Sequence, residues 1–161
     1  MPMAYALQSL LDIRLMREDR ASGELTAARQ AVRTAEEALE DRRRELEEFS
    51  RTKDERRDRI YAAIMGRAVS REQIDLAQEG VARIDEEGAL RVDNVHRAEG
   101  ELKTREEAAE TARVAFIAAS KNRMKIDEHR AVWVTEEARE QEHRAEGELE
   151  DFTGRKQNLD D

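Results

Sequence analysis

The chain has 161 residues, of which 42% are charged and 4% are aromatic, with a net charge of -9, one proline and no cysteine. So many charged side chains and so few aromatic ones exclude a large globular core, and the regular spacing of apolar residues among helix formers argues against disorder. The composition therefore favours long paired helices, and the lack of cysteine excludes disulfides and thiolate chemistry.

The first predicted helix runs from about Ala4 to Met65. Steps of three and four residues from Leu7 reach mostly apolar side chains, and this heptad phase persists along the whole segment. The positions that we expect to form its buried seam are Leu7, Leu11, Arg14, Glu18, Ala21, Leu25, Ala28, Val32, Ala35, Leu39, Arg42, Leu46, Phe49, Lys53, Arg56, Ile60 and Ala63.

A turn is predicted at residues 66–70. Gly66 is the residue type expected just past a helix C-terminus, where the backbone becomes left-handed. Ser70 and Gln73 have the spacing of a capping box, in which each side chain bonds to the backbone N–H of the other residue. One helix therefore ends and another begins within a few residues.

The second predicted helix runs from about residue 71 to 152, and its apolar phase shifts after Trp133. Gly147 and Gly154 weaken the helix, so we expect it to fray beyond Phe152. A rival arrangement would break this helix at Gly80, but we favour an unbroken helix. Its expected seam is Ile74, Ala77, Val81, Ile84, Gly88, Arg91, Val95, Ala98, Leu102, Arg105, Ala109, Ala112, Phe116, Ala119, Arg123, Ile126, Arg130 and Trp133.

The two seams fit each other when the chain folds back at the turn with Ala63 opposite Ile74. Large side chains then lie opposite small ones, which fills an antiparallel seam without voids. The predicted fold is all-α: one antiparallel coiled-coil hairpin over residues 1–161, with the second helix extending past the N-terminus. The pairs are Ile60 with Ala77, Phe49 with Gly88, Leu39 with Ala98, Ala35 with Leu102, Leu25 with Ala112, Ala21 with Phe116, Leu11 with Ile126, and Ala4 with Trp133.

Some seam positions hold basic side chains. In this register Arg14 faces Arg123, while Lys53 and Arg56 face Ile84 and Val81. Long basic side chains can lie across a seam while their charged ends reach neighbouring carboxylates. We expect these layers either to specify the register or to leave it locally soft.

The sequence contains no pattern that indicates catalysis. The three histidines, His96, His129 and His143, have no metal-ligand spacing, and there is no phosphate-binding loop or nucleophile elbow. We therefore expect no enzyme activity, no cofactor and no metal site. No apolar run is long enough to span a bilayer and the N-terminus lacks the features of a signal peptide, so we expect a cytoplasmic protein.

Three surfaces remain as candidates for binding. Apolar residues outside the seam lie toward the termini: Leu10, Ile13, Leu15, Met16, Val114, Ile117 and Val134. They widen the helix contact, pack a dimer or bind another partner. A basic run between Arg42 and Arg59 is interleaved with acidic residues and is typical of a solvated helix face. Tyr61, Ile64, Met65 and Val69 cluster at the turn.

The stretch Tyr5–Ala21 resembles the start of the YscO (SctO) family of type III secretion proteins, which is similar to flagellar FliJ. Tyr5–Leu7 has the form aromatic-x-Leu, Leu10–Arg14 the form Leu-Leu-x-Ile-Arg, and Arg17–Ala21 the form Arg-Glu-x-x-Ala. Ala6 departs from the proline that often follows the aromatic residue in that family.

The resemblance implies a non-enzymatic central stalk that binds and stimulates a hexameric secretion ATPase. It also implies contacts with an export-gate protein and with secretion chaperones at the cytoplasmic face of the inner membrane. The residues that it places in the ATPase pore are Leu7, Leu10, Leu11, Arg14, Arg17, Arg20, Ile126 and Trp133. Those that it directs to the export gate are Tyr61, Ile64, Met65 and Val69.

Two other functions fit the pattern. One is a generic scaffold, in which two chains form a parallel dimer instead of a monomeric hairpin. The other is nucleic-acid binding by the Arg42–Arg59 run, which the acidic net charge and the lack of aromatic side chains for stacking disfavour. We therefore expect no nucleic-acid partner and no insertion into membranes.

Overall fold

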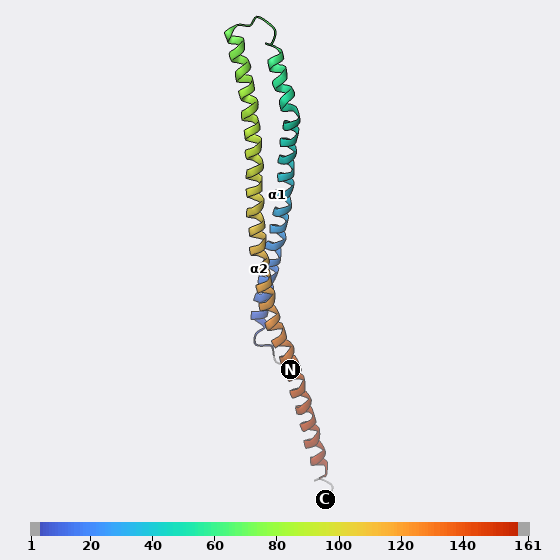
Figure 1. Ribbon diagram of the computed structural model, residues 1–161. Helices are drawn as coiled ribbons and strands as arrows, with labels where there is room; N and C mark the ends of the chain where they lie inside the picture. The colour runs from blue at the N-terminus through green and yellow to red at the C-terminus, as the bar shows by residue number, and fades with distance from the viewer. Residues whose placement is uncertain (1–3, 158–161) are drawn as a thin grey trace. The chain divides into compact units, whose positions relative to one another are not determined.

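A computed structural model describes residues 4–157 of the chain, with side chains through Thr153. Two helices, α1 (Gln8–Ala62) and α2 (Arg71–Gln157), account for nearly all of these residues, and none of them lies in a strand. α1 and α2 run in opposite directions and are joined by a loop (Figure 1). The predicted all-α hairpin is confirmed.

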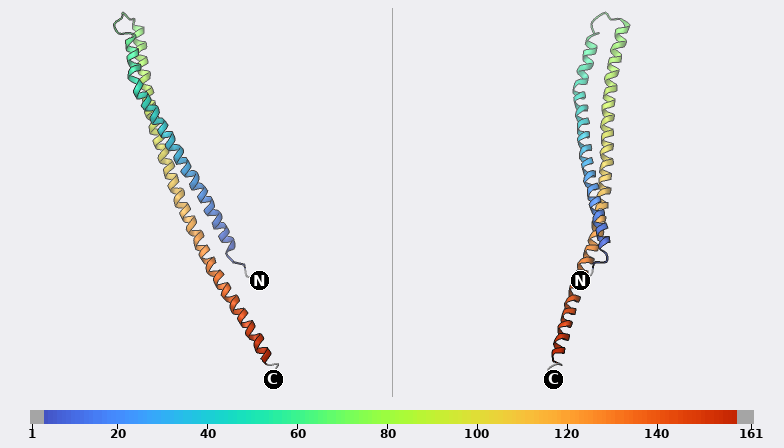
Figure 2. Two further views of the ribbon diagram at one scale, coloured as in Figure 1. Left: turned by 90° about the vertical axis from the view of Figure 1, so that its right-hand side faces the viewer. Right: turned by 180° about the vertical axis from the view of Figure 1, so that it is seen from behind.

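The described residues form two compact units. The turn unit consists of residues 25–112, and the terminal unit joins the part of α1 through Glu24 to the part of α2 from Arg113 onward. Within each unit α1 lies along α2, as the two views in Figure 2 show. In the terminal unit, α2 continues past the start of α1, as the sequence predicts.

The buried side chains follow the predicted seams. All of those on α1 and α2 lie at seam positions, and Leu11 is the most deeply buried, with 2% of its surface exposed. Burial of one such leucine contributes about 1.5–3 kcal/mol. The helices therefore depend on each other, because neither has another element against which to bury its apolar side. The buried apolar residues of the helices are Leu11, Ala21, Leu25, Ala35, Leu39, Phe49, Ala77, Ile84 and Val95.

The best-defined layer of the turn unit centres on Phe49. A Cβ added to Gly88 would lie 2.8 Å from Phe49 Cε1, so the ring occupies the space that a side chain would need. The guanidinium groups of Arg56 and Arg91 lie 5.8 and 5.6 Å from the ring centroid. Both also bind Glu87, at 2.8 and 2.9 Å. The predicted Phe49–Gly88 pair is confirmed, and the basic seam residue Arg56 reaches a carboxylate as expected.

The turn has the predicted capping signals but starts earlier than predicted. Gly66 has φ +72°, the Ser70 amide donates to Gln73 Oε1 at 2.9 Å, and the Gln73 amide donates to Ser70 Oγ at 3.3 Å. α1 ends at Ala62 instead of Met65, because the Ile64 amide bonds to the Tyr61 carbonyl three residues back and tightens the last turn.

The outer limits of the helices also differ from the prediction. α1 starts at Gln8 instead of Ala4, because residues 6 and 7 form a turn in which the Gln8 amide bonds to the Tyr5 carbonyl. α2 continues to Gln157 instead of fraying after Phe152. A glycine weakens a helix by only about 1 kcal/mol, and the Thr153 hydroxyl adds a bond to the Leu149 carbonyl at 3.1 Å. α2 is unbroken at Gly80, as we favoured.

The Phe49 layer predicts opposite effects for two glycine substitutions in α2. We expect Gly88→Ala to lower the free energy of unfolding by about 1 kcal/mol, because overpacking costs about 1–3 kcal/mol and the gain in helix propensity offsets only part of it. Gly100→Ala should raise it by about 0.5–1 kcal/mol, since nothing lies within 4 Å of an added Cβ there. Urea unfolding followed by circular dichroism measures both, and equal shifts of the same sign would contradict the proposed packing.

Candidate partner-binding surfaces

The terminal unit begins with an aromatic contact. Tyr5 precedes α1 and is buried against α2, with its ring centroid 5.3 Å from that of Trp133 and 5.8 Å from that of His129. The Tyr5 hydroxyl lies 2.7 Å from His129 Nδ1 and donates to it when the ring proton is on Nε2. This contact ties the residues before α1 to α2.

The prediction that Ala4 packs on Trp133 is wrong by one residue. Ala4 is exposed and Tyr5 takes the place opposite Trp133. The chain has left the helical repeat before Gln8, so a register extrapolated from the heptads no longer applies there. The aromatic-x-Leu pattern contained the signal for Tyr5, whereas nothing in the sequence singled out His129 as its partner.

The second contact of the terminal unit is an ion pair across the helices. Arg123 donates through Nε and Nη2 to the two carboxylate oxygens of Glu18, and its Nη1 lies 3.3 Å from Asp127. Its side chain and that of Glu18 are only 23% and 17% exposed. The hydrogen bond from Arg123 lowers the pKa of the Glu18 carboxyl below its usual value of 4.5, against the opposing effect of burial.

In the layer where Arg14 is predicted to face Arg123, the charged end of Arg123 reaches a carboxylate, as expected. Arg14 Nη1 instead donates to the Asn122 carbonyl of α2 at 3.4 Å, while Arg123 turns toward Glu18. Long flexible side chains place their charges a helical turn away from their Cα atoms. The heptad pattern places both Glu18 and Arg123 in the seam. An acid on one helix and a base on the other was therefore the feature of the sequence from which this pair could have been predicted.

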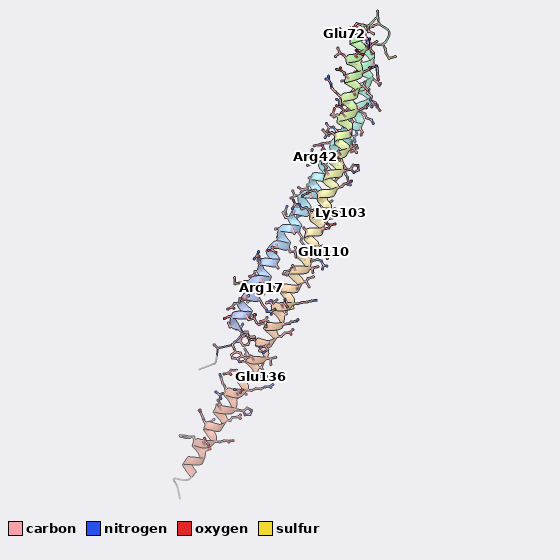
Figure 3. The ribbon with its side chains drawn as sticks, turned by 90° about the vertical axis from the view of Figure 1, so that its left-hand side faces the viewer. Arg17, Arg42, Glu72, Lys103, Glu110 and Glu136 are labelled. Atoms are coloured by element: carbon pink, nitrogen blue, oxygen red, sulfur yellow. The ribbon has the colours of Figure 1, made fainter. Side chains whose placement is uncertain are left out.

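The residues assigned to the ATPase pore lie in the terminal unit, and we call them the terminal surface. Arg17 and Arg20 are exposed. Arg20 binds Glu24 at 3.0 Å, while Arg17, which Figure 3 labels on α1, makes no ion pair within the described part of the chain. A shallow groove runs beside them, lined by Arg14, Arg17, Ala115, Ala118, Ala119 and Asn122.

The apolar members of the terminal surface differ in what they offer to a partner. Leu7, Leu10, Ile126 and Trp133 are half-buried. Leu11 belongs to the core of the hairpin and contributes packing between the helices, so its neighbours provide the surface. The exposed arginines and the half-buried leucines together make an apolar surface with a positive edge, which suits a partner with carboxylates around an apolar site.

The residues assigned to the export gate lie where the turn unit closes, and we call them the turn surface. Tyr61 and Met65 are exposed, Met65 by 70%, while Ile64 and Val69 are half-buried. The turn thus presents two large side chains to solvent although its backbone is already closed by hydrogen bonds. Exposed Tyr and Met are residue types that interfaces favour.

The described residues contain no group of three metal-ligating side chains. Within the same residues, no helix has an apolar stretch long enough to cross a membrane. What the described part of the chain does present is two paired helices with separate exposed surfaces. The molecule is thus an antiparallel coiled-coil hairpin with candidate surfaces for protein partners.

Comparison with known proteins identifies the family. The family described as type III secretion protein YscO matches residues 7–155, so the chain belongs to the YscO family of type III secretion proteins. A solved structure of a proposed YscO homologue, CT670 from Chlamydia trachomatis, is similar with a TM-score of 0.70 and 20% identity, over 95% of this chain and 93% of that one. No curated protein matches the sequence. The YscO resemblance of Tyr5–Ala21 is thereby confirmed.

The Glu18–Arg123 pair predicts how stability depends on pH. Because the folded-state pKa of Glu18 is lowered, the pair stabilises the fold above pH 4.5, and this contribution is lost as pH falls through the lowered value. We expect Glu18→Gln to lower the melting temperature at pH 7, and this effect to shrink as the pH falls through the lowered pKa of Glu18, since the carboxyl is then protonated in the native protein. Thermal unfolding at a series of pH values measures this.

Asp19→Asn is the matched control, since Asp19 is an exposed neighbour of Glu18 on the same helix. We expect its melting temperature to follow that of the native protein throughout. An equal loss of stability in both substituted proteins at pH 7, or a loss for Glu18→Gln that does not shrink as the pH falls, would show that the ion pair does not stabilise the hairpin.

Proposed function

We propose that this protein is the non-enzymatic central stalk of a type III secretion ATPase complex. It binds and stimulates the hexameric ATPase, contacts the export gate and engages secretion chaperones in the cytoplasm. Membership of the YscO family supports a role in type III secretion. The observation that carries the finer proposal is the exposed Arg17, which has no ion pair among the described residues and lies beside the leucines of the terminal surface.

The terminal unit has a form that suits entry into a pore. It consists of two paired helices followed by α2 alone, and a single helix with its side chains is about 10–12 Å across. An asymmetric element in a sixfold pore makes different contacts with each subunit. Since a ligand shifts an equilibrium only by its differential affinity for the states, such contacts favour different ATPase conformations in turn.

The turn surface is proposed to bind the export gate. It lies in the other unit from the terminal surface, so the ATPase and the gate would use different residues. A stalk that contacts both transmits the state of one to the other. The chaperones are proposed partners for which no surface is assigned.

The terminal surface is tested by charge reversal. We expect Arg17→Glu with Arg20→Glu to reduce ATPase stimulation and to weaken ATPase binding by at least about tenfold, or roughly 1.4 kcal/mol, because the acids would repel a carboxylate-lined site. Arg29→Glu is the control, since Arg29 is exposed on the same helix but lies in the turn unit. The measurements are ATP hydrolysis and binding with the purified secretion ATPase of the same organism.

If the protein with Arg17→Glu and Arg20→Glu binds and stimulates the ATPase as well as the native protein does, the assignment of these residues to the ATPase contact is wrong. Absence of binding by the native protein at micromolar concentration would remove the stalk function as a whole. Light scattering then examines the alternative scaffold, because a hairpin monomer has a mass of 18.6 kDa and a parallel dimer has twice that.

The turn surface has its own test. We expect Tyr61→Ser with Met65→Ser to weaken binding to the soluble domain of the export-gate protein, because removing two large contact residues from an interface commonly costs about 2 kcal/mol or more. ATPase stimulation should stay unchanged. Leu90→Ser, at an exposed leucine elsewhere in the turn unit, is the control, and equal gate binding by all three proteins would assign the gate contact to another surface.

A further inference from the structure

Two ion pairs join α1 to α2 along one side of the turn unit. Arg43 lies 3.3 Å from Glu99, and Arg57 donates to Asp85. The two arginines are two heptads apart on α1, and the two acids are two heptads apart on α2. In a coiled coil, charged residues at such flanking positions bridge the helices, and their long side chains cover the seam.

The heptad between these two pairs lacks a third pair. Ser50 and Val92 hold the equivalent positions, and both are exposed. A serine and a valine cannot form an ion pair, and both are too short to extend across the seam. They line a groove of about 240 Å³, which we call the Lys53 groove after the lysine that also lines it.

The walls of the Lys53 groove are mainly apolar. Phe49 and Ile84, which are buried, line it together with Leu46 and Val92, which are more exposed. Its volume is below the roughly 300–1,000 Å³ of typical small-molecule pockets. The groove therefore suits a large apolar side chain of a protein partner better than a ligand of cofactor size.

Among the described residues that line the groove, Lys53 supplies the one unpaired charge. Its side chain is half-buried and makes no ion pair, whereas Arg57 and Asp85 bond to each other. A partner that covered the groove would remove water from the ammonium group of Lys53. Burial of an unpaired charge is costly, so the partner needs a carboxylate within reach of Lys53. This requirement favours an acidic partner over an apolar or a basic one.

The same features disfavour other kinds of occupant. Two copies of this chain related by a twofold axis would bring the same surface of each copy into contact. A hollow would then face a hollow, and the two Lys53 side chains would repel each other. A nucleic acid needs several free cations along its backbone, but Arg57 is already paired and Asp85 would repel a phosphate.

We propose that the Lys53 groove binds an acidic segment of another protein. An apolar side chain of that segment packs against Phe49, Ile84 and Val92, and a neighbouring Asp or Glu accepts hydrogen bonds from Lys53. The groove lies wholly within the turn unit and shares no residue with the terminal surface or the turn surface. This site goes beyond the proposed function and does not depend on it.

A variant with a closed groove provides the reference for the test. Ser50→Arg with Val92→Glu puts an arginine and an acid at the positions that carry ion pairs one heptad away on either side. We expect a third ion pair to form over the groove and close it. The net charge of the chain stays the same, and circular dichroism checks that the hairpin is folded.

Short random peptides displayed on phage are the probe. They are first depleted on the closed-groove variant and then selected on the native chain. We expect the enriched peptides to carry Asp or Glu close to a large apolar residue. If no peptide depends on the open groove, or if the enriched peptides lack acids, the proposal is wrong.

Substitution of Lys53 tests the charge. Fluorescence anisotropy with a labelled synthetic copy of a selected peptide measures the affinity. We expect Lys53→Glu to weaken binding by about tenfold or more, and a peptide with Lys in place of its acid to recover affinity for that variant. Lys103→Glu is the control and should leave binding unchanged, because Lys103, labelled in Figure 3, is exposed in the same unit and does not line the groove.

Two further results would overturn the proposal. Equal losses for Lys53→Glu and Lys103→Glu would show only a general effect of net charge. A dimer in analytical ultracentrifugation that dissociates in the closed-groove variant would make the occupant a second copy of this chain.

Discussion

The structure depends on one constraint: each helix has only the other against which to bury its apolar side. Two paired helices share a single line of contacts. Each seam side chain is therefore either covered by the residues that face it on the other helix or exposed to solvent. Phe49 shows how little tolerance this leaves, because its ring fits only where Gly88 has no side chain.

Charged side chains at the seam do not weaken the hairpin as their positions alone suggest. Arg56 and Arg91 lie over the ring of Phe49 and converge on Glu87, whose pKa is lowered because both arginines donate hydrogen bonds to it. Arg123 binds Glu18 in a similar way. Such half-exposed pairs fix which residues meet across the helices more than they add stability. In a seam of alternating alanines and leucines, many registers pack almost equally well, so this selection matters.

The surfaces proposed for partners are those that folding leaves unused. Arg17 lies on α1 and Met65 in the loop between α1 and α2, and both side chains are exposed outside the buried seam. Partners that bound these surfaces would leave the seam undisturbed.

The sequence by itself determined the helices, the turn and the seam, because a heptad repeat and a capping box are local patterns with direct physical meaning. It also determined the family through Tyr5–Ala21, and the large-against-small pairing of Phe49 with Gly88. Only the tertiary structure decided the pairing of Tyr5 with His129 and of Arg123 with Glu18. Long side chains bond to groups about one helical turn away from their own layer, so the heptad register does not specify these partners.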